Sequence, residues 1–348
     1  LQMCIIVSIY SMSRLLKNSY SKITAVSTVV PKRKILNNHF SYFDDQKSLE
    51  KSFSMIGVNQ RFWSDKTTTA ADLCCKAAKD IFRNTIHEEA EIDAVIFITQ
   101  SPNYQMPATV FEIHKVLGLN ESALCLDVNL GCSGYVYGLF LSNSLISMGL
   151  SKVLLLAGET PSKFLDKNDT GTSILFGDAG SASIIEKTEE ARDSSYRFKS
   201  RGSGFETISI PSGIHKSIKG FENKKTLSMH GPDVFNFTIK EIPKFIKEHI
   251  DSVSNEIQDY DYILLHQANL FMLKHIYKKA GVSEGQRLTN IDKYGNTSSA
   301  TLPLLLTDKK IILNKAKKFM LVGFGVGLSW GIADIILDEN VYIKHFGE

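Results

Sequence analysis

The amino-acid sequence predicts an α/β protein with mostly parallel sheets, built as two fused halves. Short, continuously apolar segments alternate with helix-like segments, the pattern of sheets that helices cover on both faces. Two of these segments, 94–99 (AVIFIT) and 262–265 (YILL), end in a polar loop that leads into a helix, which is a weak sign of internal duplication. The length of 348 residues also exceeds the size at which one hydrophobic core usually stops growing.

The first half is expected to contain four strands and three helices. Residues 23–30 (ITAVSTVV) alternate and are rich in β-branched side chains, so they form the first predicted strand. Further strands are expected at 94–99, 123–130 and 152–158. Residues 68–83 begin with threonines that can cap a helix and then place apolar residues at helical spacing. Two more helices are predicted, at about 108–117 and directly after the 123–130 strand.

The second half repeats this order of elements. A long helix is predicted at about 232–253, a strand at 262–265 and a helix that ends near residue 280. The loop YGNTSSA leads into another helix, and the segment LVGFGVGLSWGIADIIL is interpreted as two strands joined by a glycine-rich bend. A polar segment at 188–225 separates the halves. We therefore expect an N-terminal half at 21–190 that carries a nucleophile and a C-terminal half at 191–348.

Residues 1–20 are interpreted as a leader that is disordered or artefactual. Their apolar run, LQMCIIVSIYSM, is too short to cross a bilayer. It has no lysine or arginine before Arg14, so the positive region of a secretory signal is missing. The chain begins with leucine, and Met12 is a candidate start residue. We expect no membrane-embedded part.

Composition and cysteine usage narrow the class of protein. Forty Lys and Arg against 37 Asp and Glu give a net charge of +3, which is too balanced to predict nucleic-acid binding. The five cysteines are odd in number and have no zinc-like spacing. We therefore expect reduced thiols, no metal site and a cytoplasmic location.

Three residues stand where chemistry is expected in an α/β protein. Cys132 follows a buried strand in the first turn of a predicted helix, where the helix dipole lowers a thiol pKa and favours the nucleophilic thiolate. His266 stands at the carboxyl end of a buried strand, and Asn296 lies in the YGNTS loop. Taken singly, each has an ordinary alternative as a structural cysteine, a satisfied polar histidine or a turn asparagine. The glycine-rich segment 323–331 lacks the spacing of a phosphate-binding loop.

Five motifs in a fixed order decide between these alternatives. They are GCSGYVYGL around Cys132, FGDAGSAS at 176–183, HQANL at 266–270, YGNTSSA at 294–300 and GFGVGLSWG at 323–331. Together they resemble β-ketoacyl-acyl-carrier-protein synthase III, a branch of the thiolase superfamily, over nearly the whole chain from residue 23. The resemblance implies an α/β thiolase-like five-layered αβαβα fold made of two similar halves, each with a mixed five-stranded sheet, in a homodimer.

The resemblance also implies a reaction and its residues. An acyl thioester primer would acylate Cys132, and malonyl-acyl-carrier protein would then lose CO2 and condense with that acyl group to give a 3-oxoacyl-acyl-carrier protein. His266 and Asn296 would donate hydrogen bonds during decarboxylation, His266 through a ring N–H. Backbone N–H groups of Cys132 and Val326 would form the oxyanion hole. No cofactor is expected beyond the CoA or phosphopantetheine that carries the substrates.

Further residues are expected to contact the acyl chain and the carrier protein. By the same resemblance, Phe324 packs close to the sulfur and shapes the acyl pocket, and Met106 reaches across the dimer to limit the acyl chain. Lys278 and Lys279 match a basic pair that meets the acidic acyl-carrier protein, although lysines are also common at solvated helix ends.

The match to relatives that use acyl-CoA is incomplete. Those relatives clamp the adenine with a Trp and Arg side chains, and alignment of the motifs places Lys51, Met55 and Thr170 at these positions. Phe271 replaces an Arg that follows the HQANL motif. The stacking plane and guanidinium forks are therefore missing. We expect less dependence on CoA, with a primer that arrives on a carrier protein or as another thioester.

Three alternatives have less support. A non-decarboxylating acyltransferase of a specialised pathway would use the same acyl-cysteine, but such relatives often lose the Asn or the His that remain here. A 3-hydroxy-3-methylglutaryl-CoA synthase-like enzyme would need a Glu where Gln100 stands. A non-catalytic partner subunit would usually have lost the nucleophile, which is present here as Cys132.

Overall fold

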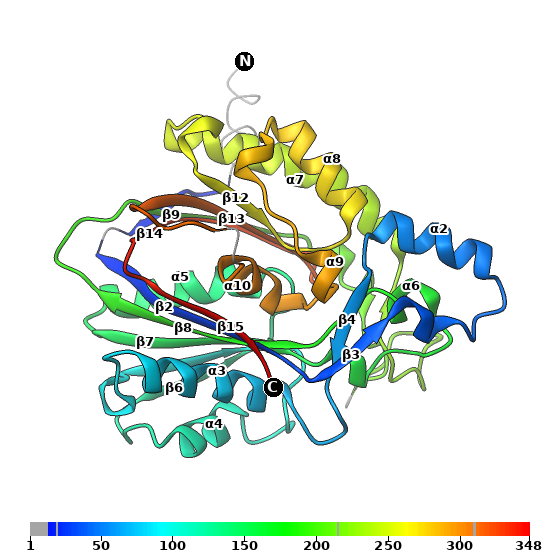
Figure 1. Cartoon of the computed structure of the whole chain (residues 1–348), viewed down its shortest axis with the longest axis horizontal. Helices are drawn as coiled ribbons and strands as arrows, with labels where there is room; N and C mark the ends of the chain where they lie inside the picture. The colour runs from blue at the N-terminus through cyan, green and yellow to red at the C-terminus, as the bar shows by residue number, and fades with distance from the viewer. Residues whose placement is uncertain (1–12, 19, 214–215, 309–310) are drawn as a thin grey trace.

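The computed structural model describes residues 13–18, 20–213, 216–308 and 311–348, and two stacked mixed sheets occupy its centre (Figure 1). The first sheet has the order β1–β9–β14–β13–β12, formed by Leu16–Asn18, Ser194–Ser200, Ser329–Leu337, Lys317–Gly325 and Tyr262–Leu265. The second has the order β15–β2–β8–β7–β5–β6, formed by Tyr342–Gly347, Ser21–Val30, Ala179–Lys187, Lys152–Glu159, Ala94–Ile98 and Leu124–Val128.

Helices form three layers between and outside these sheets (Figure 1). Helices α5 (Gly134–Ser147) and α10 (Thr301–Leu306) lie between the sheets. The outer layers are α7 (Gly231–Val253) and α8 (Leu270–Ala280) on the first sheet, and α3 (Ala70–Asn84) and α4 (Val110–Leu117) on the second. The result is the five-layered αβαβα arrangement that the resemblance implied.

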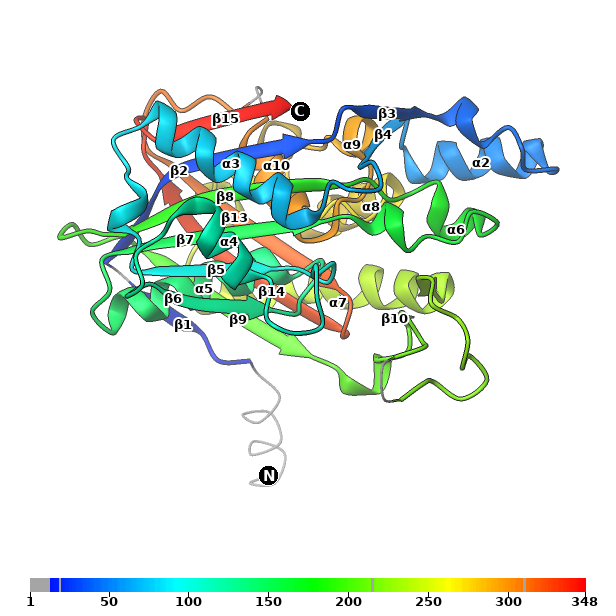
Figure 2. The same ribbon diagram turned by 90° about the horizontal axis from the view of Figure 1, so that it is seen from below.

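Shorter elements gather at one end of the sheets (Figure 1, Figure 2). They are β3 (Arg33–Leu36), β4 (Gln60–Trp63), α2 (Gln46–Ile56), α6 (Thr170–Ser173), β10 (Ile208–Ser209), β11 (Ser228–Met229) and α9 (Ile291–Tyr294). Short 3₁₀ segments span Asn37–Phe40, Glu89–Glu91, Pro161–Lys163, Gly202–Gly204, Ile257–Asp259, Glu284–Gln286 and Ser298–Ala300. Gly57 (φ +72°) caps the end of helix α2, and a β-carbon there would lie 2.4 Å from Leu270 Cβ, so α2 and α8 approach closely.

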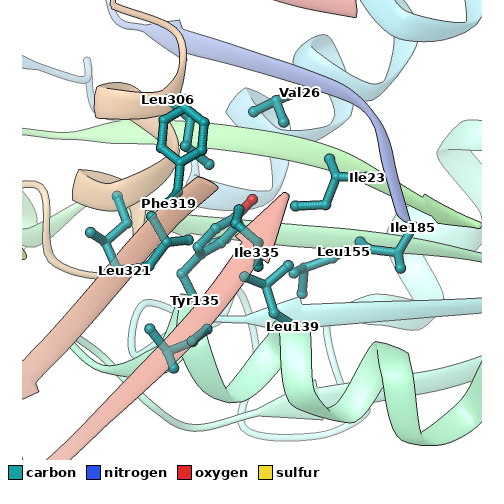
Figure 3. Packing of buried hydrophobic residues seen from close by; sticks show 14 of the residues in the cluster. Ile23, Val26, Tyr135, Leu139, Leu155, Ile185, Leu306, Phe319, Leu321 and Ile335 are labelled. Carbon is teal, nitrogen blue, oxygen red and sulfur yellow. The ribbon is translucent and has the colours of Figure 1, made fainter. Parts of the chain in front are cut away.

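A hydrophobic core fills the space between the two sheets (Figure 3). Tyr135 and Leu139 of α5 lie in this core with Leu155 of β7 and Ile335 of β14. Helix α5 is rich in apolar residues on most of its surface, as expected of a helix with a sheet on either side. This buried helix begins two residues after Cys132, so the core also fixes the position of the predicted nucleophile.

The sheets are mixed, so the expectation from the strand pattern of mostly parallel sheets is wrong. Strand pairs β13–β14, β9–β14, β2–β8 and β7–β8 are antiparallel, whereas β12–β13, β5–β6, β5–β7 and β2–β15 are parallel. Continuous apolar runs report burial on both faces but not strand direction. The glycine-rich bend joins β13 directly to β14, and such a short connection permits only an antiparallel pair.

Two strands cross the expected boundaries between the segments of the chain. Strand β1 lies in the range expected to be a leader and pairs with β9 of the first sheet. Strand β15, at the C-terminal end, pairs with β2 and gives the second sheet six strands rather than the expected five. Residues 1–12 and 19 of the expected leader lie outside the described residues, whereas residues 13–15 and 20 are described.

The predicted helices and strands lie close to their expected positions. The helix expected at 68–83 is α3, and the side chains of Thr69 and Asp72 form a reciprocal cap at its start. Across the described ranges, we find no helix with the length and apolar character needed to span a membrane.

Candidate active site

A cavity of about 570 Å³ contains the three predicted catalytic residues. Cys132 lies just before α5, His266 just after β12 and Asn296 in the loop after α9, and all three line this cavity. Phe324 and Val326, also expected here, line it with them. Two halves of the chain therefore supply side chains to one cavity.

The glycine-rich bend packs closely against Cys132, just before the N-terminus of α5. Helix α5 begins at Gly134 and is preceded by Ser133, so Cys132 lies just outside the first turn that was expected to contain it. A β-carbon at Gly325 (φ +155°) would lie 2.7 Å from Cys132 Cβ and 2.9 Å from its Sγ. Only glycine fits there, which explains why the bend can carry backbone N–H groups to the sulfur.

The thiol of Cys132 is protonated at rest, contrary to the expected thiolate. Burial raises its pKa to about 11, and the carboxyl of Glu159 acts in the same direction. Hydrogen bonds from the Ser298 hydroxyl, with Oγ 3.9 Å from Sγ, and from the backbone N–H of Val326 lower it. The expectation from the helix dipole omitted the cost of removing the sulfur from water. A base must therefore take the proton when Cys132 reacts.

His266 is buried, neutral and oriented by Thr301. Its Nδ1 lies 2.7 Å from Thr301 Oγ1, and that hydroxyl lies 3.0 Å from the carbonyl oxygen of Ser298. A carbonyl only accepts, so the Thr301 proton goes to Ser298 and the Thr301 oxygen accepts from Nδ1–H. Burial lowers the pKa of His266 to about 3. The ring therefore keeps its proton on Nδ1 and presents an unprotonated Nε2, while Phe324 packs edge-on with ring centres 5.4 Å apart.

Asn296 is fixed so that its amide N–H groups remain available. Its side-chain Oδ1 accepts from the Ser298 N–H at 2.9 Å. Its backbone N–H donates to Leu175 O at 3.0 Å, and its backbone oxygen accepts from Gly177 N at 3.0 Å. Among the described residues no group accepts from its Nδ2. The motif FGDAGSAS thus acts as a support for the YGNTSSA loop.

Ser298 is a site residue that sequence reasoning missed. It contacts Cys132 through its hydroxyl, Asn296 through its N–H, and Thr301 through its carbonyl oxygen. Its φ of +51° is unusual for a residue with a β-carbon, and such conformations concentrate at functional sites. The only signal in the sequence was its position two residues after Asn296.

Glu159 was also missed, although it lines the cavity and is almost fully buried. Its carboxylate accepts from Gln100 N–H at 2.9 Å and from Ser101 Oγ at 2.6 Å. Burial raises the pKa of this carboxyl to about 7, against the lowering effect of these hydrogen bonds. An acidic residue at the end of the apolar strand KVLLLAGE was the available signal.

The remaining predicted residues lie outside this cavity. Met106 is 79% exposed and does not line it. Lys278 and Lys279 are exposed in the last turn of α8. Within the part of the chain that the structure describes, no group of three His, Cys, Asp or Glu side chains is placed to hold a metal ion.

Comparisons with known proteins agree with this fold and show the family. The sequence-family model for 3-oxoacyl-[acyl-carrier-protein] synthase III matches residues 126–202, and the family model for the C-terminal part of that enzyme matches residues 251–335. A putative 3-oxoacyl-[acyl-carrier-protein] synthase 3 of Campylobacter jejuni is 32% identical over 347 residues, which cover 93% of this chain and 96% of that protein. A β-ketoacyl-[acyl-carrier-protein] synthase III of Enterococcus faecalis is 33% identical over 321 residues, covering 90% and 98%.

A solved structure gives the same result. The crystal structure of a 3-oxoacyl-(acyl-carrier protein) synthase from Burkholderia xenovorans superposes with a TM-score of 0.94 at 37% identity and covers 97% of this chain and 100% of that one. The fold and these relatives define a thiolase-fold condensing enzyme, as predicted. Within that class, the chain belongs to the β-ketoacyl-acyl-carrier-protein synthase III family and is an acyltransferase of that type.

Proposed function

We propose that this enzyme condenses an acyl thioester primer with malonyl-acyl-carrier protein, releasing CO2 and forming a 3-oxoacyl-acyl-carrier protein. The observation that carries the proposal is the link through Ser298, which contacts the nucleophile Cys132 and holds the amide of Asn296 in the same cavity. The names of the relatives describe the same chemistry.

The first half-reaction transfers the acyl group to Cys132. His266 Nε2 takes the thiol proton while Sγ attacks the thioester carbonyl carbon. The backbone N–H groups of Cys132 and Val326 hold the oxyanion, and support for this comes from the Val326 N–H that already bonds to the sulfur. When the carbon–sulfur bond of the donor breaks, its thiolate recovers the proton from His266.

The second half-reaction consumes one proton, which His266 carries. The ring takes up a proton on Nε2 while the malonyl carboxylate lies beside it, because a neighbouring negative charge favours the imidazolium. Loss of CO2 leaves an enolate whose oxygen accepts from Nε2–H and from the amide of Asn296. The enolate carbon attacks the acyl-cysteine, and the departing Cys132 thiolate takes the proton from His266.

Decarboxylation is favoured over simple acyl transfer by the state of Asn296. Its side-chain N–H donors have no acceptor among the described residues. Transfer of an acyl group between thiols would not require these donors, whereas the enolate formed by decarboxylation would. The non-decarboxylating acyltransferase is the second candidate function. It shares the acyl-cysteine and differs only in releasing no CO2.

We also propose that the primer reaches the cavity on a carrier protein rather than on CoA. The exposed Lys278 and Lys279 would steer an acidic carrier protein toward α8. At the cavity mouth Met55 is 57% exposed and Phe271 is 48% exposed, and neither side chain carries the guanidinium group that would pair with the phosphates of a nucleotide. We expect priming with one acyl group to be faster from carrier protein than from CoA. A strong preference for CoA in side-by-side assays would contradict this.

We further propose a cytoplasmic homodimer that needs no additional cofactor. Among the described residues, strand β6 pairs only with β5 and leaves an open edge, where Leu124 is 40% and Leu126 is 37% exposed. A second copy on this edge would bring Met106, also exposed, to an acyl pocket. The four described cysteines are free thiols, as in a reducing compartment. A mass of twice 38.8 kDa measured by light scattering would support the dimer, and the mass of a monomer would refute it.

Carboxyl-labelled malonyl-carrier protein tests the reaction. With primer, the wild type should release labelled CO2, and Asn296→Ala should still form acyl-Cys132 but release CO2 about 100- to 1000-fold more slowly. Asn223→Ala, in an exposed loop, is the matched control and should behave as wild type. Acyl transfer without labelled CO2 would instead establish the second candidate function.

A further inference from the structure

Two carboxamide side chains beside the nucleophile have no place in the reaction described above. Gln100 and Asn129 both line the cavity that holds Cys132. They follow the ends of neighbouring parallel strands, since Ile98 of β5 is in register with Val128 of β6. Gln100 also touches the segment of the nucleophile: a β-carbon at Gly131 would lie 2.4 Å from Gln100 Oε1.

We propose that these two carboxamides recognise a hydroxyl group on the acyl primer. The proposal rests on the proposed function, because it concerns the acyl group that Cys132 accepts. Gln100 Nε2 donates to Asn129 Oδ1 at 3.2 Å. Among the described residues, Gln100 Oε1 and Asn129 Nδ2 then have no hydrogen-bond partner, which leaves a free acceptor on one carboxamide and free N–H donors on the carboxamide bonded to it. A hydroxyl donates one hydrogen bond and accepts another, so it satisfies both groups.

Either orientation of the two carboxamides leaves the same kinds of free group. If both carboxamides were turned over, Asn129 would donate to Gln100, and the free groups would again be one donor and one acceptor. A saturated acyl chain at this place would cover two polar groups without satisfying them, and unpaired polar groups are costly to bury. The pair therefore discriminates against an unsubstituted chain as well as favouring a hydroxylated one.

Glu159 holds Gln100 in position before any substrate arrives. Its carboxylate accepts from the Gln100 backbone N–H and from Ser101 Oγ, and that hydroxyl oxygen accepts from Thr160 N–H at 3.1 Å. Thr99 N–H also bonds to Val128 O at 3.1 Å, which ties the two loops together. These bonds fix the backbone of the Gln100 loop, which reduces the conformational freedom that the residue loses on binding and so favours selective recognition.

The cavity also indicates the charge of the recognised group. Among its lining residues, all within the described ranges, there is no lysine or arginine, and Glu159 is the only acidic side chain. A primer with a second carboxylate would find no cation to pair with and a carboxyl group close by. An uncharged substituent is therefore selected over an anionic one.

The pair lies on the acyl side of the nucleophile. The exposed apolar residues at the mouth come from α2, α8 and the segment after β10, as Met55, Phe271 and Ile210. Those elements lie at one end of the molecule, whereas β5 and β6, which precede Gln100 and Asn129, belong to the second sheet (Figure 2). The carrier arm enters at the mouth, so Gln100 and Asn129 contact the acyl group beyond the sulfur.

Single-turnover acylation with matched primers tests the proposal. The full chain would be mixed with butyryl, 2-hydroxybutyryl and 3-hydroxybutyryl thioesters of carrier protein and of CoA, and acyl-Cys132 followed by mass spectrometry. At least one hydroxylated primer should acylate about tenfold faster than butyryl, as expected for one to two hydrogen bonds. Gln100→Leu should remove this ratio, and Gln258→Leu, an exposed glutamine away from the cavity, should keep it.

Asn129→Leu provides a second variant should Gln100→Leu fail to fold, because Asn129 is exposed. It should also abolish the preference for the hydroxylated primer. If butyryl acylates as fast as both hydroxylated primers in the wild type, the proposal is wrong while the condensing function stands. If no primer acylates Cys132, the proposed function fails as well.

Discussion

Ser298 joins the three reactive side chains through three different groups of one residue. Its hydroxyl contacts Cys132, its N–H fixes Asn296, and its carbonyl oxygen sets the hydrogen-bond direction of Thr301 and so of His266. The energies involved are small, about 1 kcal/mol for each neutral hydrogen bond. Their value lies in fixing which atoms donate and which accept before the substrate arrives.

The raised pKa of Cys132 gives a prediction at this scale. Alkylation of Cys132 by iodoacetamide should accelerate with pH up to about 11, because only the thiolate reacts and burial raises the pKa to that value. Ser298→Ala removes a hydrogen bond that lowers this pKa, so alkylation at pH 9 should be several-fold slower. Peptide mass spectrometry reads the rate, with the Cys125 peptide as the internal reference. A wild-type rate that levels off by pH 8 would contradict the account.

The meeting of Cys132, His266 and Asn296 in one cavity could be predicted from the sequence, whereas the residues that hold them in place could not. Cys132, His266 and Asn296 stand inside motifs whose order is specific to a family. The roles of Ser298 and Glu159 depend on a positive φ and on contacts such as that between Glu159 and Gln100, 59 residues apart. No local periodicity reports such contacts.

The glycine-rich bend between β13 and β14 is the element that completes the site. Its residues 323 and 325 have no β-carbon, so the bend approaches Cys132 and places the Val326 N–H at the sulfur. The antiparallel pairing of Gly323 with Gly331 and of Gly325 with Ser329 holds the bend in register. The sequence predicted this bend and its two strands, since glycines interrupt an otherwise apolar segment.

Gly325→Ala should therefore abolish catalysis more than it affects folding. The new β-carbon would meet Cys132 Cβ at 2.7 Å and Sγ at 2.9 Å, and a φ of +155° is poorly tolerated by alanine. We expect acylation of Cys132 to fall at least 100-fold, measured by intact mass. Gly202→Ala, where nothing lies within 4 Å, is the control and should acylate normally. Normal acylation in Gly325→Ala would show that the bend does not position the sulfur.

At the scale of the whole molecule, the two sheets meet so that each supplies part of one site. Cys132 follows β6 of the second sheet, whereas His266 follows β12 of the first. The sequence predicted two similar halves but not their exchange of strands, because β15 pairs with β2 across more than 300 residues. His345 of β15 bonds to Thr28 and to Tyr294 OH, which links this C-terminal strand to the YGNTSSA loop.

The fate of one acyl group tests the cooperation of the two halves most directly. Incubation with an acyl thioester should add a single acyl group to the peptide that contains Cys132. Addition of malonyl-acyl-carrier protein should then remove it, with one CO2 and one 3-oxoacyl product for each group lost. An acyl group on another residue, or one that leaves Cys132 without forming the 3-oxoacyl product, would contradict the account.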